Sequence, residues 1–129
     1  MKIKLYSIFV DDQEEGLRFY TDVVGFTKKQ DIPAGGARWI TVTSSEGSDD
    51  LELSLEPNSH PAAKAYQTAL RNDNIPVTAF ESEAIHDEVK RLKEKGVVFT
   101  LDPTNAGPVT IAIFSDTCGN LIQIYQVNA

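Results

Sequence analysis

The sequence contains an internal repeat that spans about half of the chain. Residues of similar character recur 71 positions apart in the 129-residue sequence, including Gly25 and Gly96, each of which follows an expected helix. Repetition at a fixed period is the signature of a duplicated supersecondary unit. The repeat therefore predicts two copies of one unit. The other matching pairs are Phe9 and Phe80, Ile40 and Ile111, Val42 and Ile113, Ser44 and Ser115, Leu51 and Ile122, and Leu53 and Ile124.

Both copies are predicted to have the element order βαβββ. Alternating apolar residues indicate the strands, and apolar residues at helical spacing, such as Ile85 and Val89, indicate the helices. Asp11 or Asp12 is expected to cap the first helix and Ser82 the second. The expected strands are 2–10, 26–30, 39–44, 51–55, 76–81, 97–101, 109–115 and 120–126, and the turns of the first copy are 33–36 and 46–49.

A short helix is expected to connect the two copies. His60 and Pro61 begin a run of residues that suits a helix with proline in its first turn. A chain of this length typically forms one domain with a sizeable core. We therefore expect a single α+β domain over residues 1–129, with a first module at about 1–57, a linker helix at about 59–72 and a second module at about 73–129.

Several local motifs of the chain match a known family. They are Ile8-Phe9-Val10-Asp11-Asp12, Phe19-Tyr20, Val24-Gly25-Phe26, the strand that carries Glu52, and Asp116-Thr117-Cys118-Gly119-Asn120-Leu121-Ile122-Gln123-Ile124. With these motifs the sequence resembles the vicinal oxygen chelate superfamily, which includes glyoxalase I, extradiol dioxygenases, fosfomycin-resistance enzymes and bleomycin-resistance proteins. The resemblance implies a glyoxalase-like fold, in which the two modules form a curved mixed sheet with helices on its outer face. It also implies a concave cup that holds the ligand.

The strand that begins at Leu51 reads Leu-Glu-Leu-Ser-Leu-Glu-Pro, so its leucines lie on one face and its polar residues on the other. In a fold of the implied kind, helices cover the leucine face, and Glu52 and Ser54 then face the cup. The repeat makes Gln123 the counterpart of Glu52, and Tyr125 faces the same way as Gln123. An unpaired carboxylate in a partly apolar cup would be costly when ionised, so either its pKa rises or a donor pairs with it. The alternative is that Glu52 lies on the solvated side of a half-buried sheet.

Metal-dependent relatives take one ligand from the first strand and one from the last strand of each module, which here gives Leu5, Glu52, Val77 and Gln123. Leu5 and Val77 cannot bind a metal, and hydroxyl groups from their neighbours would be poor substitutes for imidazole or carboxylate. We therefore predict no complete metal site. If a divalent metal binds, Glu52 and Gln123 are its expected ligands.

Aromatic and histidine side chains complete the expected ligand site. Trp39 alternates with Ile40, so it should face the cup or its rim together with Tyr125, and such a cavity suits a small organic ligand. Core packing is the alternative for Trp39. His60 either caps the linker helix or contacts the ligand, and His86 is expected to be a solvated helix residue. Cys118, the only cysteine, is expected to lie in a turn and cannot form an internal disulfide.

The charge of the chain limits its partners. The formal net charge is −7 and basic residues are scattered, which gives no basis for binding nucleic acid. The N-terminal segment alternates as a strand does and is neither a signal peptide nor a membrane span. A cytoplasmic protein is therefore expected.

These features favour a small-molecule-binding protein of the glyoxalase/bleomycin-resistance type. The alternative is a metal-dependent glyoxalase-like lyase or isomerase, or an extradiol-type dioxygenase, with the metal held by Glu52 and Gln123. Glu52 is the candidate catalytic residue, either as a general base or as a group that orients a ligand. A third interpretation, an interaction module with a vestigial cup, lacks a long exposed apolar segment to support it. The resemblance also implies a homodimer.

Overall fold

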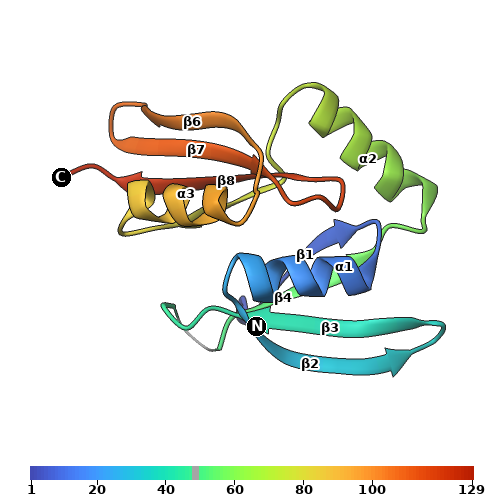
Figure 1. Cartoon of the computed structure of the whole chain (residues 1–129). Coiled ribbons are helices and arrows are strands. Elements are labelled where there is room, and N and C mark those ends of the chain that lie inside the picture. Colours follow the sequence, from blue (N-terminus) through green and yellow to red (C-terminus); the bar gives the residue numbers. More distant parts are fainter. Residues whose placement is uncertain (48–49) are drawn as a thin grey trace. The chain divides into compact units, whose positions relative to one another are not determined.

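The computed structural model describes residues 1–47 and 50–129, and each half of the chain contains one four-stranded sheet (Figure 1). The chain divides into two compact units, Met1–Ala65 and Tyr66–Ala129. The boundary lies within helix α2 (Pro61–Asn72), which corresponds to the expected linker helix. The turn expected at 46–49 includes residues 48 and 49, which lie outside the described residues.

The first unit has the element order β1 (Leu5–Val10), α1 (Gln13–Arg18), η1 (Phe19–Val23), β2 (Thr27–Ala34), β3 (Ala37–Thr43) and β4 (Glu52–Pro57). Its strands are arranged β1-β4-β3-β2. β1 runs parallel to β4, and the other neighbouring strands are antiparallel.

The second unit repeats this arrangement with β5 (Thr78–Glu81), α3 (Ile85–Glu94), β6 (Phe99–Asn105), β7 (Val109–Ser115) and β8 (Leu121–Val127). Its strand order is β5-β8-β7-β6, with the same parallel pairing between the first and last strands. The predicted α+β fold with two βαβββ modules is therefore confirmed.

The helix boundaries follow local chemistry. Asp12 is the N-cap of α1, where its carboxylate accepts a hydrogen bond from the backbone N–H of Glu15 at 3.0 Å. Gly25 and Gly96 follow the helical segments with φ of 100° and 86°, a conformation that favours glycine. The predicted cap at Ser82 is wrong, because Ser82 accepts a hydrogen bond from the backbone N–H of Ala84, one residue before α3 begins.

Each sheet packs one face against its own helix. In the first unit α1 contacts β3 and β4, and a Cβ added at Gly16 of α1 would lie 3.1 Å from a methyl carbon of Val10. In the second unit α3 contacts β7 and β8 through its buried apolar residues. The registers place Ile8, Val10, Ile40, Val42, Leu53 and Leu55 on the helix-covered face of the first sheet, and Ala112, Phe114, Ile122 and Ile124 on that of the second.

The single offset of 71 positions is wrong in two pairs of strands. Val42 pairs with Leu53, whereas Ile113 pairs with Gln123, on the opposite face of the sheet from Ile124. Phe9 likewise pairs with Glu56 on the face away from the helix, whereas Phe80 pairs with Ile124 on the helix-covered face of its sheet. The side chains of a strand alternate with period two. A connection that is longer or shorter by an odd number of residues in one module therefore moves the equivalent side chain to the other face of its sheet.

A side chain from α1 completes the hydrogen bonding where β3 and β4 separate. The Gln13 side-chain N–H groups donate to the carbonyls of Arg38 and Leu55 at 2.6 and 2.9 Å, and its carbonyl accepts from the Arg38 backbone N–H at 3.1 Å. Arg38 in turn forms ion pairs with Asp31 and Glu14, both at 2.7 Å. Helix α1 is therefore joined by hydrogen bonds to the backbone next to Trp39.

The loop at 116–120 is held by a buried carboxylate in the second unit. Asp116 accepts hydrogen bonds from the backbone N–H groups of Cys118 and Asn120 at 2.8 and 3.0 Å, and from the Asn120 side chain at 2.7 Å. Gln67 of α2 donates to the Asn120 side-chain oxygen at 2.9 Å and to the Cys118 carbonyl at 3.3 Å. Cys118 therefore lies in a turn, as predicted, and is fully buried.

Candidate functional site

One face of the first sheet carries a row of polar side chains. We use the term polar face for the side of this sheet that lies opposite α1. The residues that the strand registers place on it include Leu5 and Ser7 of β1, Glu52, Ser54 and Glu56 of β4, Trp39 and Thr41 of β3, and Gln30 and Ile32 of β2. The predicted split of the β4 side chains between two faces is confirmed.

Glu52 is at the centre of a hydrogen-bond network on the polar face. Its side chain is buried, with 7% of the residue exposed, and its Oε1 atom accepts hydrogen bonds from Thr41 Oγ1 and Gln30 Nε2, both at 2.8 Å. The Gln30 carbonyl oxygen accepts from the indole N–H of Trp39 at 3.2 Å. An indole N–H only donates and an ionised carboxylate only accepts, so this arrangement fixes the orientation of the Gln30 amide.

The network keeps Glu52 ionised. The hydrogen bond from Thr41 is the largest cause that lowers the pKa of Glu52 below its ordinary value of 4.5, followed by the bond from Gln30. Burial acts in the opposite direction, and the ammonium groups of Lys29 and Lys4 add to the lowering. Of the two expected outcomes, a raised pKa or pairing with a donor, the structure has the second.

This lowered pKa predicts a specific loss of stability in acid. The folded state favours the ionised carboxylate, so the contribution of Glu52 to stability is present above the ordinary pKa of 4.5 and is lost as the pH falls through the lower folded value. Between pH 7 and about pH 3, we expect the free energy of unfolding to fall more steeply for the wild type than for Glu52→Gln. Urea unfolding at several pH values measures this difference, and parallel slopes would contradict it.

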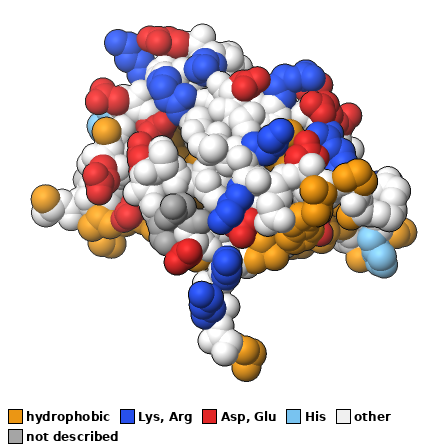
Figure 2. Space-filling view, turned by 90° about the horizontal axis from the view of Figure 1, so that it is seen from below, with side chains coloured by type: hydrophobic (Ala, Val, Ile, Leu, Met, Phe, Trp, Pro, Cys, Tyr) orange, Lys and Arg blue, Asp and Glu red, His pale blue; other side chains and the backbone are white. Residues whose placement is uncertain are grey.

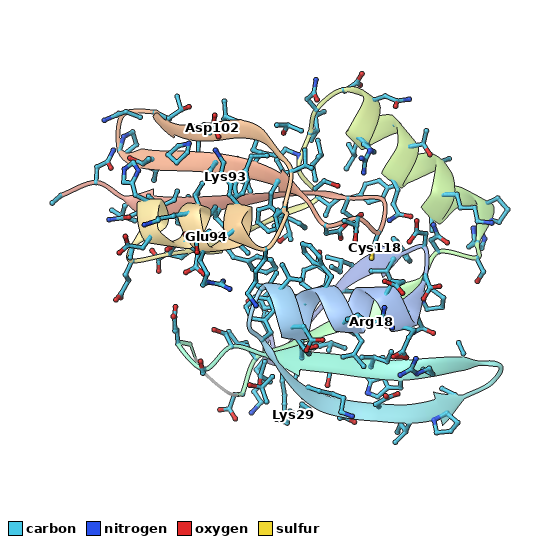
Figure 3. All side chains as sticks on the ribbon, viewed as in Figure 1. Arg18, Lys29, Lys93, Glu94, Asp102 and Cys118 are labelled. Atoms are coloured by element: carbon cyan, nitrogen blue, oxygen red, sulfur yellow. The ribbon has the colours of Figure 1, made fainter. Side chains whose placement is uncertain are left out.

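A β-bulge brings a lysine next to this carboxylate. The register of β2 against β3 shifts between Lys28, which pairs with Val42, and Gln30, which pairs with Thr41, so that Lys29 is an additional residue. The ammonium of Lys29 lies 3.9 Å from Oε2 of Glu52 (Figure 3 labels Lys29 on β2). Bulges of this kind redirect side chains. Here Lys29 and Gln30 both approach Glu52.

The residues around Glu52 do not fit a first-row divalent metal ion. Its neighbour in the parallel register is Leu5, which has no ligating atom, and Thr41 and Gln30 already donate to the carboxylate. Within residues 1–47 and 50–129, no group of three or more His, Cys, Asp or Glu residues could hold a metal ion. Lys29 also places positive charge beside the second carboxylate oxygen. Such ions prefer several imidazole, thiolate or carboxylate ligands.

The corresponding face of the second sheet is more apolar. Gln123 pairs with Ile113 and Tyr125 pairs with Ile111, and both Gln123 and Tyr125 are half-buried. The register of β5 against β8 places Ala79 beside Gln123, so Val77 is not the counterpart of Leu5 that the resemblance implied. The Val77 backbone N–H instead donates to the carbonyl of Leu121.

The remaining predicted site residues have simple local roles. His60 is exposed, and its Nδ1 atom accepts from the backbone N–H of Ala62 at the start of α2, which is the capping alternative. His86 is exposed on α3, as expected. Ser54, two residues after Glu52 on the same face of β4, is fully buried and donates hydrogen bonds to Ser7 Oγ and the Tyr6 carbonyl. Sequence reasoning missed Gln30, Thr41 and Lys29.

The surface charge is mixed. Figure 2 shows basic and acidic side chains interspersed over one face of the molecule. A surface that binds nucleic acid phosphates is strongly basic. The mixed charge on this face and the net charge of −7 do not have that character. Among the described helices, none is long and apolar enough to cross a membrane.

Two βαβββ modules, each with a mixed sheet backed by one helix, define the class of fold to which this chain belongs. The profile of the Glyoxalase/Bleomycin resistance protein/Dioxygenase superfamily matches residues 2–124, and the chain belongs to this superfamily. The uncharacterized protein YurT of Bacillus subtilis (strain 168) is 56% identical over 126 residues, which cover 98% of this chain and 99% of YurT.

Solved structures of related proteins have the same fold. The crystal structure of UcmS2 has a TM-score of 0.84 at 25% identity, covering 97% of each chain. TnmS3, described as an antibiotic binding protein from Streptomyces sp. CB03234, has a TM-score of 0.79 at 27% identity, covering 99% of this chain and 97% of TnmS3.

Proposed function

We propose that this protein binds a small organic molecule on the polar face of its first sheet, with Glu52 as the acceptor that orients the ligand. The observation that carries the proposal is a buried, ionised carboxylate on the face away from the helix, held by Thr41 and Gln30. A charge in this setting is costly to bury and is fixed by its donors, which suits a group that recognises a ligand.

The two oxygens of Glu52 have different roles in this proposal. Oε1 accepts both of the short hydrogen bonds, whereas the Lys29 ammonium lies 3.9 Å from Oε2. An ionised carboxylate has lone pairs on both oxygens, so Oε2 retains capacity to accept a hydrogen bond from a ligand. The hydrogen bonds to Oε1 hold the carboxylate in place, and Oε2 is the oxygen that accepts a hydrogen bond from the ligand.

Trp39 supplies the apolar contact. Its indole N–H is held by Gln30, which fixes the ring, and the residue is half-buried on the same face as Glu52. An aromatic surface next to a fixed polar group is typical of sites for small organic ligands. Gln123 and Tyr125, on the corresponding face of the second sheet, remain predicted ligand contacts of their own unit.

Binding is favoured over catalysis by the chemistry of Glu52. A general base works best when its pKa is near the working pH, and the hydrogen bonds from Thr41 and Gln30 lower the pKa of Glu52 instead. The donor set around it also does not fit the metal that the enzyme alternative would need. The description of TnmS3 as an antibiotic binding protein is in keeping with a binding role.

Exchange of Glu52 for glutamine tests this proposal. Glu52→Gln keeps the shape and the acceptor for Thr41 and Gln30 but removes the charge, so we expect affinity for aromatic ligands to fall about tenfold or more, because hydrogen bonds to charged groups contribute about 1.5–3 kcal/mol. Calorimetric titration measures the affinity. The indole N–H signal of Trp39, the only tryptophan, reports binding at this face in proton–nitrogen correlation spectra.

Glu56→Gln is the matched control, because Glu56 lies four residues further along the same face of β4 and is half-buried. We expect its affinity to stay within about twofold of the wild type, because no ligand contact is assigned to it. Equal affinity in Glu52→Gln and the wild type would overturn the proposal.

A further inference from the structure

We infer that the ligand presents a neutral aromatic or enolic hydroxyl group to this site, with its oxygen between Oε2 of Glu52 and the ammonium of Lys29. This inference rests on the proposed function and names the chemical class that the same site recognises. It specifies the hydroxyl group that the protein binds and leaves the rest of the ligand unspecified.

The geometry of the pair carries the inference. The two charged atoms are 3.9 Å apart, which is longer than a direct hydrogen bond between them. A hydroxyl O–H that donates to a carboxylate lies about 2.6 Å from its oxygen, and an ammonium that donates to an oxygen lies about 2.8 Å from it. These two lengths form a triangle with a 3.9 Å base, so one hydroxyl oxygen can contact both groups.

A hydroxyl matches this pair because it both donates and accepts. Its proton goes to Oε2, which only accepts, and its lone pairs receive an N–H of Lys29, which only donates. An ammonium on the ligand would donate to Glu52 but would be repelled by Lys29, and Lys4 adds positive charge that acts on Glu52. A carboxylate on the ligand would be repelled by Glu52. The site therefore selects against both charged classes.

The surrounding residues add the preference for an unsaturated ring. Gln30 is next to Lys29 in β2 and holds the indole of Trp39, so the charged pair and the aromatic surface are joined through adjacent residues. A hydroxyl attached directly to a flat, unsaturated system keeps the ring close to its oxygen. Such a ligand can contact the indole while its hydroxyl is bound.

Four probes on one ring system test the ligand class by calorimetry: a naphthol, the corresponding methoxynaphthalene, naphthylmethylammonium and naphthoate. We expect the naphthol to bind about tenfold tighter than methoxynaphthalene, whose oxygen accepts from Lys29 but cannot donate to Glu52. The ammonium and carboxylate probes should bind more weakly than the naphthol. Tighter binding of either charged probe would overturn the inference.

Lys29→Met tests the second half of the pair, with Lys28→Met as its control. Lys28 is the neighbouring exposed lysine of β2 and pairs with Val42 on the other face. We expect Lys29→Met to weaken naphthol binding about fivefold to tenfold and to strengthen binding of the ammonium probe. Lys28→Met should change the affinity for either probe by no more than about twofold.

The outcomes separate this inference from the proposed function. If binding requires Glu52 but is unchanged in Lys29→Met, the hydroxyl inference fails and the proposed function stands. If none of the four probes binds, the hydroxyl inference fails. If Glu52→Gln binds the naphthol as the wild type does, the proposed function fails and the inference fails with it.

Discussion

Replacement of Asp116 by alanine is expected to lower the free energy of unfolding by about 3–5 kcal/mol, which is the cost of leaving buried hydrogen-bonding groups without their charged acceptor. Asp116 is fully buried and accepts from two backbone N–H groups and from the Asn120 side chain. Alanine leaves all three donors without this acceptor. The substitution also loosens Asn120, which is the group that Gln67 of α2 contacts.

Urea unfolding followed by far-ultraviolet circular dichroism measures this effect, and Asp102→Ala is the matched control. Asp102 pairs with Lys93 on the surface, and 71% of its side chain is exposed, so its removal should cost less than about 0.5 kcal/mol. Asp116→Asn should be intermediate, because one oxygen can still accept from the backbone. A cost below about 1 kcal/mol for Asp116→Ala would show that the loop does not depend on this carboxylate.

Leu55→Ala is the second substitution with a large expected effect. Leu55 is completely buried on the helix-covered face of β4, and its truncation should lower the free energy of unfolding by about 3–4 kcal/mol through lost burial and the cavity that remains. Tryptophan fluorescence is a suitable measurement, because Trp39 lies in the same unit as Leu55.

Ile32→Ala provides the comparison for Leu55→Ala. Ile32 lies on the polar face, pairs with Trp39 and is 54% exposed, so its truncation should cost less than about 1 kcal/mol. Similar losses of unfolding free energy in Leu55→Ala and Ile32→Ala would contradict the assignment of Leu55 to the helix-covered face and Ile32 to the polar face. The comparison thus tests the face assignment on which the candidate site depends.

Period-two alternation predicted the polar face well because it is a local property. The placement of Glu52 and Ser54 opposite Leu53 and Leu55 needed only the order of residues in one strand, and the registers confirm it. The fixed offset between modules failed for Ile113 and Phe80 because it assumed equal connection lengths, and a difference of one residue moves a side chain to the other face.

The partners of Glu52 could not be predicted from the sequence. Gln30 is 22 residues from Glu52 and reaches it only because β2 carries an additional residue at Lys29. Neither glycine nor proline marks this bulge, so no local signal distinguishes it from a regular strand. The Thr41 contact depends on the register between β3 and β4, which the alternation of each strand leaves open.

The additional residue in β2 has a consequence for comparing this chain with its relatives. A lysine aligned with position 29 would not by itself indicate shared chemistry, because in a strand of regular length the side chains at positions 29 and 30 would lie on opposite faces of the sheet and could not both approach the carboxylate. Proteins with the same ligand preference should therefore share the residue count of this hairpin as well as the acidic and basic side chains. Strand length, more than overall identity, would then sort homologues by what they recognise.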